Sequence, residues 1–412
     1  MRTSLLEKRK LRIAIDCRIG DFRQGIGTAI QALAKAFSQS SIDDQEYTFI
    51  VREEMQECLA SFAWGPCSVT SLPSKPASML KSVLRATPFL RSLRERFRRY
   101  PTEVPVSDGY VERCGFDLVH FPTQVAYQTS LPSIYQPHDL QHLHYPQYFA
   151  KGEFAQREAW YRAFCTQATF VCVQTEWTKA DLVSSYHLPP SKITVIPWGV
   201  PIDPDISGPA TTSSIIDKYN LPETFFFYPA VTWPHKNHLC LLQALKILRD
   251  EHSLSPSLVC TGAITDFRKT LEEAAHSAGI RQQVRYLGFV PADDLRGLYR
   301  AATAMVYPSR FEGFGLPILE AFQAGTPVLC SNSSVLPEVA QNGALYFDPD
   351  DPVKLATLLL QILEVPQMRN RLEEAGRQVL SQYSFEKTAR QFQGLYRQCE
   401  RLTVSRTSSL SC

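Results

Sequence analysis

The stretch VYPSRFEGFGLPILEAFQAGTPVLC, residues 306–330, decides the fold class of this chain. It begins with a short apolar run that ends at a proline, which is typical of a buried parallel strand. Two glycines then permit a tight loop, Pro317 suits the first turn of a helix, and Gly325 suits its end. The stretch therefore predicts strand, loop, helix and strand, with Glu312 in the loop and Glu320 about one turn into the helix.

The passage from strand to helix is the place where open parallel sheets bind ligands. Backbone N–H groups at the start of such a helix, together with the positive end of its dipole, favour a phosphate. A carboxylate beside a phosphate site is suited to accept two hydrogen bonds from a vicinal diol, which a ribose or a hexose offers. The plain alternative is that both glutamates are surface charges, because a pair at this spacing also occurs by chance.

The two glutamates and their neighbours resemble the signature of glycosyltransferase family 4, a group of retaining nucleotide-sugar enzymes with the GT-B fold. The similarity includes the Pro-Ser, Glu-Gly-Phe-Gly-Leu-Pro and Leu-Glu-Ala elements of residues 308–321. It implies an α/β fold of two Rossmann-like, doubly wound domains that face each other across a cleft. It also implies that Glu320 holds the ribose diol and Glu312 the transferred sugar's hydroxyls. The amides implied at the diphosphate are those of Phe314, Gly315 and Leu316.

The length of 412 residues predicts two domains, because the chain is too long for one ordinary core. Short apolar runs alternate with helix-like stretches in two successive series, which favours two parallel sheets. The predicted strands are residues 12–16, 47–51, 116–120, 133–136, 170–173 and 193–196 in the first series, and 225–228, 257–261, 284–287, 303–307, 328–330 and 344–347 in the second.

The domain boundary is predicted in residues 201–220, which are rich in proline, glycine, serine and threonine. We expect an acceptor-side domain at residues 1–205, with a basic insertion at about 75–113, and a nucleotide-sugar domain at residues 206–385. Residues 386–402 resemble the final family helix, which crosses back to the first domain. The polar residues 403–412 predict a disordered tail.

The bulk composition is that of an ordinary globular protein, with 44% hydrophobic and 20% charged residues. A net charge of +2 provides no argument for nucleic-acid binding. No apolar stretch reaches the roughly 18 residues of a membrane span, and no signal peptide precedes the first strand, so we predict a cytoplasmic protein. The 11 cysteines lack paired spacing, which favours small buried hydrophobes over a zinc or disulfide framework.

A glycine pair, Gly25 and Gly27, follows the first strand and its Asp16-Cys-Arg18 sequence. Such a loop can approach a diphosphate or an acceptor closely. As a dinucleotide-binding fingerprint it is incomplete, because Ile30 stands where the third glycine belongs. The pattern is similar to the first loop of many family 4 enzymes, which implies donor binding; the alternative is a turn that only packs the helix on the sheet.

Lys236 lies in the sequence Trp-Pro-His-Lys-Asn-His, directly after the first strand of the second series. An ammonium at this position can neutralise a diphosphate leaving group without a metal. The sequence resembles the family loop in which a lysine contacts the donor phosphates, so this role is implied for Lys236. Many members also carry an arginine slightly earlier. This chain has none there, which leaves open whether Thr232 or His235 contributes.

His138 lies in a Gln-Pro-His-Asp-Leu sequence, residues 136–140, that resembles the family's His-Asp loop facing the donor sugar. Its neutral imidazole can hydrogen-bond a sugar hydroxyl or the acceptor. Histidine recurs at positions 142 and 144, which raises the alternative of a zinc site. The spacing along a loop and the lack of a nearby cysteine disfavour that alternative.

Residues 75–99 alternate basic and apolar side chains, and Pro88 divides them into two short predicted helices. A basic amphipathic segment can lie on an anionic membrane, which would place the protein at the inner membrane face. The other interpretation is a surface helix whose apolar face packs on the first domain. Nucleic-acid binding is disfavoured because no recognition motif accompanies the segment.

Taken with the resemblance, these motifs imply a retaining glycosyltransferase that moves a hexose such as mannose or glucose from a nucleotide-sugar. The implied acceptor is a saccharide or lipid-linked molecule in surface polysaccharide or glycoconjugate assembly. His138, Glu312 and Lys236 are the implied catalytic residues, and we expect no metal or further cofactor. A related GT-B enzyme such as a phosphorylase or an epimerase would use the same cleft, although a phosphorylase would need a pyridoxal-bearing lysine. A non-catalytic GT-B module that binds nucleotide-sugar or partners is a further alternative.

Overall fold

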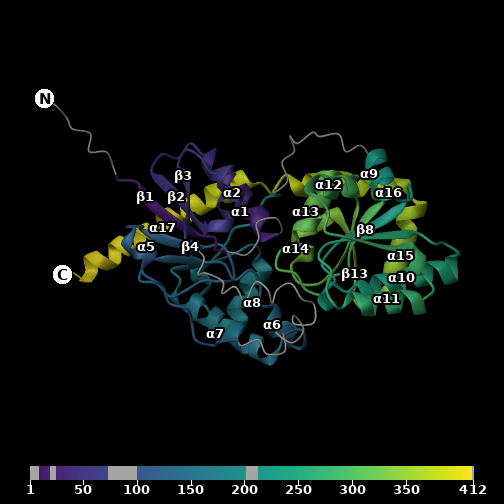
Figure 1. Cartoon of the computed structure of the whole chain (residues 1–412), viewed down its shortest axis with the longest axis horizontal. Helices are drawn as coiled ribbons and strands as arrows, with labels where there is room; N and C mark the ends of the chain where they lie inside the picture. Colours follow the sequence, from purple (N-terminus) through teal and green to yellow (C-terminus); the bar gives the residue numbers. More distant parts are fainter. Residues whose placement is uncertain (1–8, 19–24, 73–99, 201–211, 411–412) are drawn as a thin grey trace. The chain divides into compact units, whose positions relative to one another are not determined.

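The computed structural model describes residues 9–18, 25–72, 100–200 and 212–410. The chain divides into two compact units, and each is described by itself (Figure 1). Unit 1 comprises residues 1–174, residues 178–201 and the C-terminal segment from Phe385, whereas unit 2 comprises Thr175–Trp177 and the residues up to Ser384.

Unit 1 is built on a seven-stranded sheet with the order β3-β2-β1-β4-β5-β6-β7, and all its strand pairs are parallel. Strands β4 and β6 are buried along their whole length, as expected of a parallel sheet that is covered on both faces. The strands are β1 (Leu11–Asp16), β2 (Gln45–Arg52), β3 (Cys67–Leu72), β4 (Leu118–Phe121), β5 (Ser133–Tyr135), β6 (Phe170–Val173) and β7 (Ile193–Val195).

The helices of unit 1 include one that comes from the far end of the sequence, α17 (Phe385–Leu410), which packs against α1 (Ile26–Ser38) and β4. Tyr396 of α17 hydrogen-bonds His120 of β4, with 2.8 Å between its hydroxyl and Nδ1. The other helices are α2 (Gln56–Ala60), α5 (Tyr110–Arg113), α6 (Gln141–His144), α7 (Lys151–Gln167) and α8 (Glu176–Tyr186), with short 3-10 turns at Glu53–Met55, Pro146–Tyr148 and Pro190–Lys192.

Unit 2 is built on a six-stranded sheet with the order β10-β9-β8-β11-β12-β13, and its strand pairs are also parallel. Its central strand β8 contributes four successive aromatic side chains, residues 225–228, none of which has exposed area. The strands are β8 (Phe225–Pro229), β9 (Ser257–Thr261), β10 (Val284–Gly288), β11 (Ala304–Tyr307), β12 (Val328–Ser331) and β13 (Ala344–Phe347).

The helices of unit 2 cover both faces of this sheet. Figure 1 shows α12 and α13 on one side and α10, α11 and α15 on the other. The helices are α9 (Thr212–Tyr219), α10 (His238–His252), α11 (Arg268–Ser277), α12 (Ala292–Ala301), α13 (Leu316–Ala324), α14 (Leu336–Ala340), α15 (Pro352–Glu364) and α16 (Pro366–Leu380), with 3-10 turns at Pro234–Lys236, Arg281–Gln283 and Gln341–Gly343.

In each sheet, the first three strands are added toward one edge and the later strands toward the other edge, so the strand order reverses at one position. In unit 1 this switch point lies between β1 and β4, and in unit 2 it lies between β8 and β11. The loops that leave neighbouring strands at a switch point diverge to opposite faces of the sheet, which opens a crevice at the carboxyl ends of the strands. The two switch points are therefore where ligand-binding residues are expected.

All twelve predicted strands are present, with ends that differ by at most two residues. Strand β3 was not predicted, because its sequence CSVTSL lacks the long apolar run of a central strand and it lies at the sheet edge. Helix α9 occupies part of the segment whose composition predicted a linker. Helix α17 continues to Leu410, so residues 403–410 are helical where we predicted a disordered tail; no proline or glycine follows Gly394 to end the helix.

The basic segment at residues 75–99 lies outside the described residues, so its two interpretations stay predictions. Within the described ranges, none of the helices combines the length and the hydropathy needed to cross a bilayer.

Candidate functional site

Lys236 and Glu312 follow the two strands at the switch point of unit 2, β8 and β11. Their side chains form an ion pair with 2.6 Å between Nζ and Oε1. Both side chains are largely buried, with 14% and 10% of their area exposed. The structure thus brings together two of the residues that the sequence motifs singled out separately.

The backbone around Lys236 is held by hydrogen bonds that cross the switch point. Asn237 adopts a left-handed conformation with φ 57°, which asparagine tolerates better than most residues. Its side-chain amide donates to the carbonyls of Pro308 at 3.1 Å and Pro349 at 2.7 Å. The Tyr228 hydroxyl donates to the Lys236 carbonyl at 2.5 Å. Asn237 was part of the quoted motif, but its tie to the loop after β11 was not visible from the sequence.

Glu312 is held in its charged form. Burial by itself would raise the pKa of Glu312, but the Lys236 ammonium and a hydrogen bond with Ser309 bring that pKa below its ordinary value. The backbone N–H of Glu312 also donates to Ser334 Oγ at 3.0 Å, which fixes the loop. Glu312 is therefore an ionised acceptor, and Lys236 is its partner charge.

The start of α13 forms the second part of the site. Gly315 precedes the helix with φ 95°, a conformation that favours glycine, and a Cβ at this position would be in tight contact with Leu336 Cδ2 at 3.0 Å. The first N–H groups of a helix have no acceptor within the helix and carry its positive dipole end. The amides predicted at the diphosphate, those of residues 314–316, thus lie at the start of a helix of nine residues.

Glu320 lies in the same helix, and its environment differs from that of Glu312. Its Oε2 accepts a hydrogen bond from the Tyr299 hydroxyl of α12 at 2.7 Å. Burial raises the pKa of Glu320, and the Tyr299 hydrogen bond opposes that rise only in part. The site therefore holds two glutamates whose pKa values are moved in opposite directions, one by a paired ammonium and one by burial.

The sequence left open whether Thr232 or His235 contributes to the phosphate site beside Lys236. The Thr232 hydroxyl accepts the backbone N–H of Thr265 at 2.8 Å, which links the loops after β8 and β9. Burial, with a contribution from Lys236, lowers the pKa of His235 to about 4, so this imidazole is neutral at neutral pH. Neither residue therefore adds a positive charge beside Lys236.

His138 follows β5 of unit 1 in a left-handed conformation with φ 66°. Its Nε2 lies 3.0 Å from the Pro122 carbonyl oxygen, which can only accept, so Nε2 carries the proton. Burial lowers the pKa of His138 to about 4, which keeps the ring neutral. The ring edge meets Trp198 with 5.1 Å between the centroids. An interaction with the Gln174 side chain opposes this lowering of the pKa in part, and with the proton on Nε2 the other ring nitrogen, Nδ1, is the acceptor.

Gly25 and Gly27 lie at the start of α1, which follows β1. Gly25 has φ 49° and its carbonyl accepts the Thr28 hydroxyl at 2.8 Å, so the turn closes at Gly25. The helix therefore begins at Ile26, and Gly27 lies in its first turn rather than in a loop as we predicted. Among the described residues, none has an atom within 4 Å of a Cβ built on Gly25.

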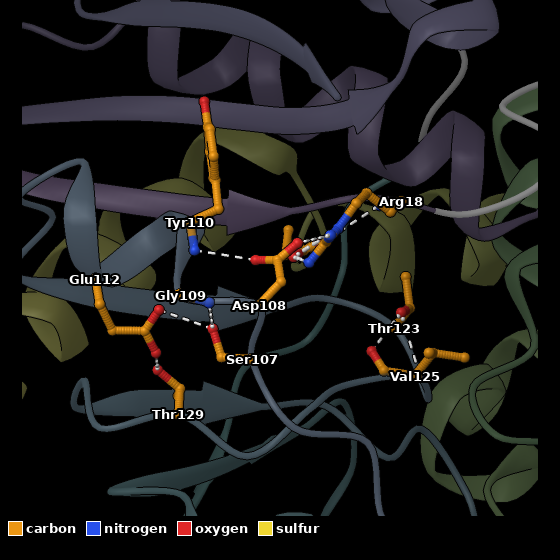
Figure 2. Close-up of polar contacts among 10 residues, drawn as sticks. Arg18, Ser107, Asp108, Gly109, Tyr110, Glu112, Thr123, Val125 and Thr129 are labelled. Carbon is orange, nitrogen blue, oxygen red and sulfur yellow. Dashed lines mark hydrogen bonds and ion pairs between the residues drawn. The ribbon is translucent and has the colours of Figure 1, made fainter. Parts of the chain in front are cut away.

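Side chains at the switch point of unit 1 form a polar cluster that the sequence analysis did not predict (Figure 2). Arg18 donates to both carboxylate oxygens of the buried Asp16, with 2.9 Å between Nε and Oδ1 and 2.5 Å between Nη2 and Oδ2. The Arg18 guanidinium lies over the Tyr127 ring at 5.1 Å and 4.0 Å from Asp108 Oδ2. Asp16 is the last residue of β1, and Arg18 follows it after Cys17. This Asp-x-Arg pattern at a strand end was the sequence signal from which the cluster could have been predicted.

The same view shows how the segment that carries Asp108 is held. The Ser107 hydroxyl donates to Glu112 Oε2 at 2.7 Å, and the Thr129 hydroxyl donates to Glu112 Oε1 at 2.6 Å. Burial of Glu112 acts to raise its pKa, but these two hydrogen bonds lower it below the ordinary value. Glu112 is thus an internal support, whereas the side chain of Asp108 is 64% exposed.

The histidines that follow His138 have separate partners. His142 Nε2 lies 3.0 Å from Glu158 Oε2, and His144 Nε2 lies 2.9 Å from Asp181 Oδ2. In the part of the chain that the structure describes, no group of three or more histidine, cysteine, aspartate or glutamate side chains is arranged to hold a metal ion.

Comparisons with known proteins agree with this geometry. Residues 23–204 match the sequence profile described as Glycosyltransferase Family 4, and residues 212–379 match that of Glycosyl transferases group 1. The Escherichia coli O-antigen chain mannosyltransferase B is 30% identical over 261 residues, which are 63% of this chain and 68% of that protein. The chain belongs to glycosyltransferase family 4.

A second relative of this family 4 chain is the O-antigen chain mannosyltransferase RfbU of Salmonella typhimurium. It is 29% identical over 238 residues, which are 57% of this chain and 62% of RfbU. The chain therefore matches less than two thirds of RfbU.

Solved structures resemble the family 4 chain over nearly its whole length. Sucrose-phosphate synthase from Thermosynechococcus elongatus has a TM-score of 0.69 at 20% identity and covers 94% of this chain, with 99% of its own chain matched. The Anabaena protein HepE, solved in complex with UDP-glucose, has a TM-score of 0.69 at 17% identity, with 94% and 100% covered. These similarities show the GT-B fold of two Rossmann-like units.

Proposed function

We propose that this family 4 glycosyltransferase transfers mannose from a nucleoside diphosphate donor, with retention of configuration. The proposed acceptor is a hydroxyl of a saccharide or lipid-linked molecule in the assembly of a surface polysaccharide. One observation carries the proposal: an ammonium, an ionised carboxylate and the start of a nine-residue helix meet at one switch point of unit 2. The ammonium and the helix start can bind a diphosphate, and the carboxylate can accept hydrogen bonds from sugar hydroxyls.

In the proposed complex the diphosphate lies at the start of α13 and beside Lys236. The amides of residues 314–316 would donate to phosphate oxygens, as helix starts do for anions. The Lys236 ammonium has three N–H donors, of which the bond to Glu312 uses one, so two can serve the phosphates. Both groups stabilise the charge that develops when the diphosphate departs, which is the main task for such a leaving group.

The two glutamates take different hydroxyl pairs in the proposed complex. Glu320 would accept the ribose diol of the nucleotide, and Glu312 would accept hydroxyls of the transferred sugar. Glu312 is suited to this second role because Lys236 holds it ionised and in place. In unit 1, the unprotonated Nδ1 of His138 would accept a further hydroxyl.

The donor sugar is inferred from the relatives. The E. coli and Salmonella proteins reported above are O-antigen mannosyltransferases, which supports mannose as the sugar and a polysaccharide as the product. HepE was solved with UDP-glucose, which makes glucose the second sugar to test. No cofactor or metal is part of the proposal.

Retention is proposed to occur without a bond between sugar and protein. The acceptor hydroxyl would attack from the face on which the diphosphate departs, and the departing phosphate oxygen would take its proton. The pairing of Glu312 with Lys236 supports this view, because an ammonium on the carboxylate weakens it as a nucleophile. Intact-protein mass spectrometry during turnover should show no glycosyl adduct; a trapped adduct on Glu312 would contradict the proposed route.

The test of the donor site is thermal stability of the full chain against GDP-mannose, UDP-glucose, GDP and UDP. We expect one base to raise the midpoint, because a ligand that binds only the native state stabilises it by mass action. The shift should disappear in Lys236→Met and persist in Lys246→Met, whose lysine pairs with Asp250 elsewhere on unit 2. No shift with any nucleotide would contradict the proposed function, and donor binding without turnover would indicate a non-catalytic module.

A further inference from the structure

The hydrogen bond between Tyr299 and Glu320 joins two helices of unit 2 at the proposed ribose site. The Tyr299 hydroxyl lies 2.7 Å from Oε2 of Glu320, and the tyrosine side chain has no exposed area. Among the described residues, the structure provides no hydrogen-bond donor for the other carboxylate oxygen, Oε1. The protein thus hydrogen-bonds Oε2, and Oε1 is available to a ligand.

Tyr299 is itself fixed at several points. Its ring meets the buried Phe227 ring of β8 edge-on, with 5.1 Å between the centroids and an interplanar angle of 88°. Its backbone carbonyl accepts the Thr326 hydroxyl at 2.7 Å. Thr326 directly follows the glycine that ends α13, so the tyrosine is tied to both the middle and the end of that helix. These contacts fix the orientation of the Tyr299 hydroxyl toward Glu320.

The pKa values of Tyr299 and Glu320 determine which of the two groups donates the hydrogen bond. Burial raises the pKa of the Tyr299 phenol well above its ordinary value, so the hydroxyl keeps its proton at neutral pH. A phenol that donates to a carboxylate forms a charge-assisted hydrogen bond, which is stronger than one between neutral groups. Burial works against the charge of Glu320, and the Tyr299 bond works for it. The tyrosine therefore favours the form of Glu320 that accepts hydrogen bonds.

We propose that Tyr299 is a positioning residue that aims the Glu320 carboxylate at the ribose diol of the bound nucleotide. The inference rests on the proposed function, because it assumes a nucleotide at the start of α13. Tyr299 acts through Glu320 and does not contact the sugar. A merely structural role would be to satisfy a buried carboxylate, and it would not depend on whether the ligand carries a diol.

The test compares ligands with and without the diol by isothermal titration calorimetry on the full chain. The probes are GDP and UDP, of which the tighter binder to the wild type is used, and the 2′,3′-dideoxy analogue of the same nucleotide. For the wild type, we expect loss of the diol to weaken binding about tenfold or more, since buried acceptors are then left unpaired. For Tyr299→Phe, we expect about tenfold weaker binding of the ribonucleotide but only about twofold sensitivity to the diol.

Tyr47→Phe is the matched control, because it also removes a buried hydroxyl that donates to a side chain, Gln45, at 2.8 Å in unit 1. Its nucleotide affinities should equal those of the wild type. A second variant separates positioning from damage to the fold: in a Glu320→Gln background, Tyr299→Phe should cause no further loss of affinity. A further loss there would overturn the inference.

The remaining outcomes are also decisive. Wild-type affinity in Tyr299→Phe, or an equal loss for ribonucleotide and dideoxynucleotide, would refute the role of Tyr299 and leave the donor site as proposed. Failure of the wild type to bind either nucleotide would refute the proposed function and, with it, this inference.

Discussion

The switch points of the two units have the same sheet topology but different crossover connections. In unit 1, β4 is joined to β5 by residues 122–132, a described segment without a helix. In unit 2, the chain leaves β11 and enters α13 within nine residues, so a helix start lies at the crevice. The first crossover connection, from β1 to β2 in unit 1 and from β8 to β9 in unit 2, is similar in the two units. Its helix, α1 or α10, begins after a residue with positive φ, Gly25 or Asn237.

The difference indicates that the switch point of unit 2 is the one that favours an anion. The start of α13 and the Lys236 ammonium both favour negative charge. In unit 1 the corresponding cation, Arg18, is already bound through two nitrogens to the buried Asp16, and the exposed Asp108 lies beside it. Topology therefore determines where a ligand can bind, while the connections and charges determine which ligand it is. The following experiments test this contrast.

The largest effect is expected from Lys236→Met. Loss of the ammonium removes the group that we propose stabilises the departing diphosphate, so kcat/KM should fall by about 100-fold to 1000-fold, as for other preorganised charge stabilisers. The variant also leaves Glu312 buried without its partner, which should lower the free energy of unfolding by about 3 kcal/mol. Donor turnover and chemical denaturation measure the two effects.

The double variant Lys236→Met/Glu312→Gln separates these effects. It should recover most of the lost stability, because no unpaired charge remains, and it should recover none of the activity. Recovery of turnover would show that the lysine serves only to neutralise Glu312, and the contrast between the units would lose its main support.

Glu320→Gln should weaken nucleotide binding by about tenfold to 100-fold, because the carboxylate that we propose accepts hydrogen bonds from the ribose diol is replaced by a neutral amide. Wild-type affinity should also fall as the pH drops through the raised pKa of Glu320, whereas the affinity of the variant should be flat in that range. Titration calorimetry across pH measures both. A variant with the same pH profile as the wild type would contradict the role of this carboxylate.

The same variant should make the unliganded protein more stable at neutral pH. A carboxyl whose pKa is raised by folding stabilises the fold only below its unfolded pKa, and this contribution is lost as the pH rises through the folded pKa. Removing the charge should therefore raise the melting temperature by about 2–4 °C for each kcal/mol gained at neutral pH, and by almost nothing near pH 4. A lower melting temperature at neutral pH would show that Glu320 contributes to the fold.

Gly315→Ala and Gly25→Ala compare the glycines of the two switch points directly. Both have positive φ, which costs an alanine about 1–2 kcal/mol. Within the part of the chain that the structure describes, only Gly315 of the two has a close neighbour, Leu336 Cδ2 at 3.0 Å from a built Cβ, so Gly315→Ala should be the more destabilising substitution. Thermal unfolding of both variants measures this difference. Equal losses would show that the crowding at the start of α13 has no energetic consequence.

The smallest effect on donor binding is expected from Asp108→Asn in unit 1. Nucleotide affinity should stay within about twofold of the wild type, because this exposed carboxylate belongs to the unit without the anion site. A tenfold loss of nucleotide affinity would break the contrast between the two units.

Much of the fold could be predicted from local sequence. Buried parallel strands are short apolar runs bounded by turn residues, and this pattern located β8 and β11 within one residue of their ends. The exceptions have physical causes. Strand β3 is a polar edge strand, and α17 continues to Leu410 because no breaking residue follows Gly394.

The candidate site was predictable only in part. The motifs singled out Glu312, Glu320 and Lys236 because they lie in loops and helices with characteristic neighbours. Tyr299 had no such signal, since a tyrosine inside an amphipathic helix reads as an ordinary core residue. The Asp16–Arg18 pair was quoted for its position after the first strand, but its contact with Tyr127 joins segments that are distant in the sequence.

Local sequence is enough to specify the alternation of strand and helix, the glycines at the turns and the set of charged residues that follow the strands. These are local properties, which depend on hydrophobic periodicity and on backbone conformations available to a few residue types. Only the tertiary structure decided which of those residues meet. Strand order placed Lys236 against Glu312 and Tyr299 against Glu320, and burial then moved the pKa values of the two glutamates in opposite directions. Contacts between distant segments and the loss of water around a charge arise only when the sheet is assembled.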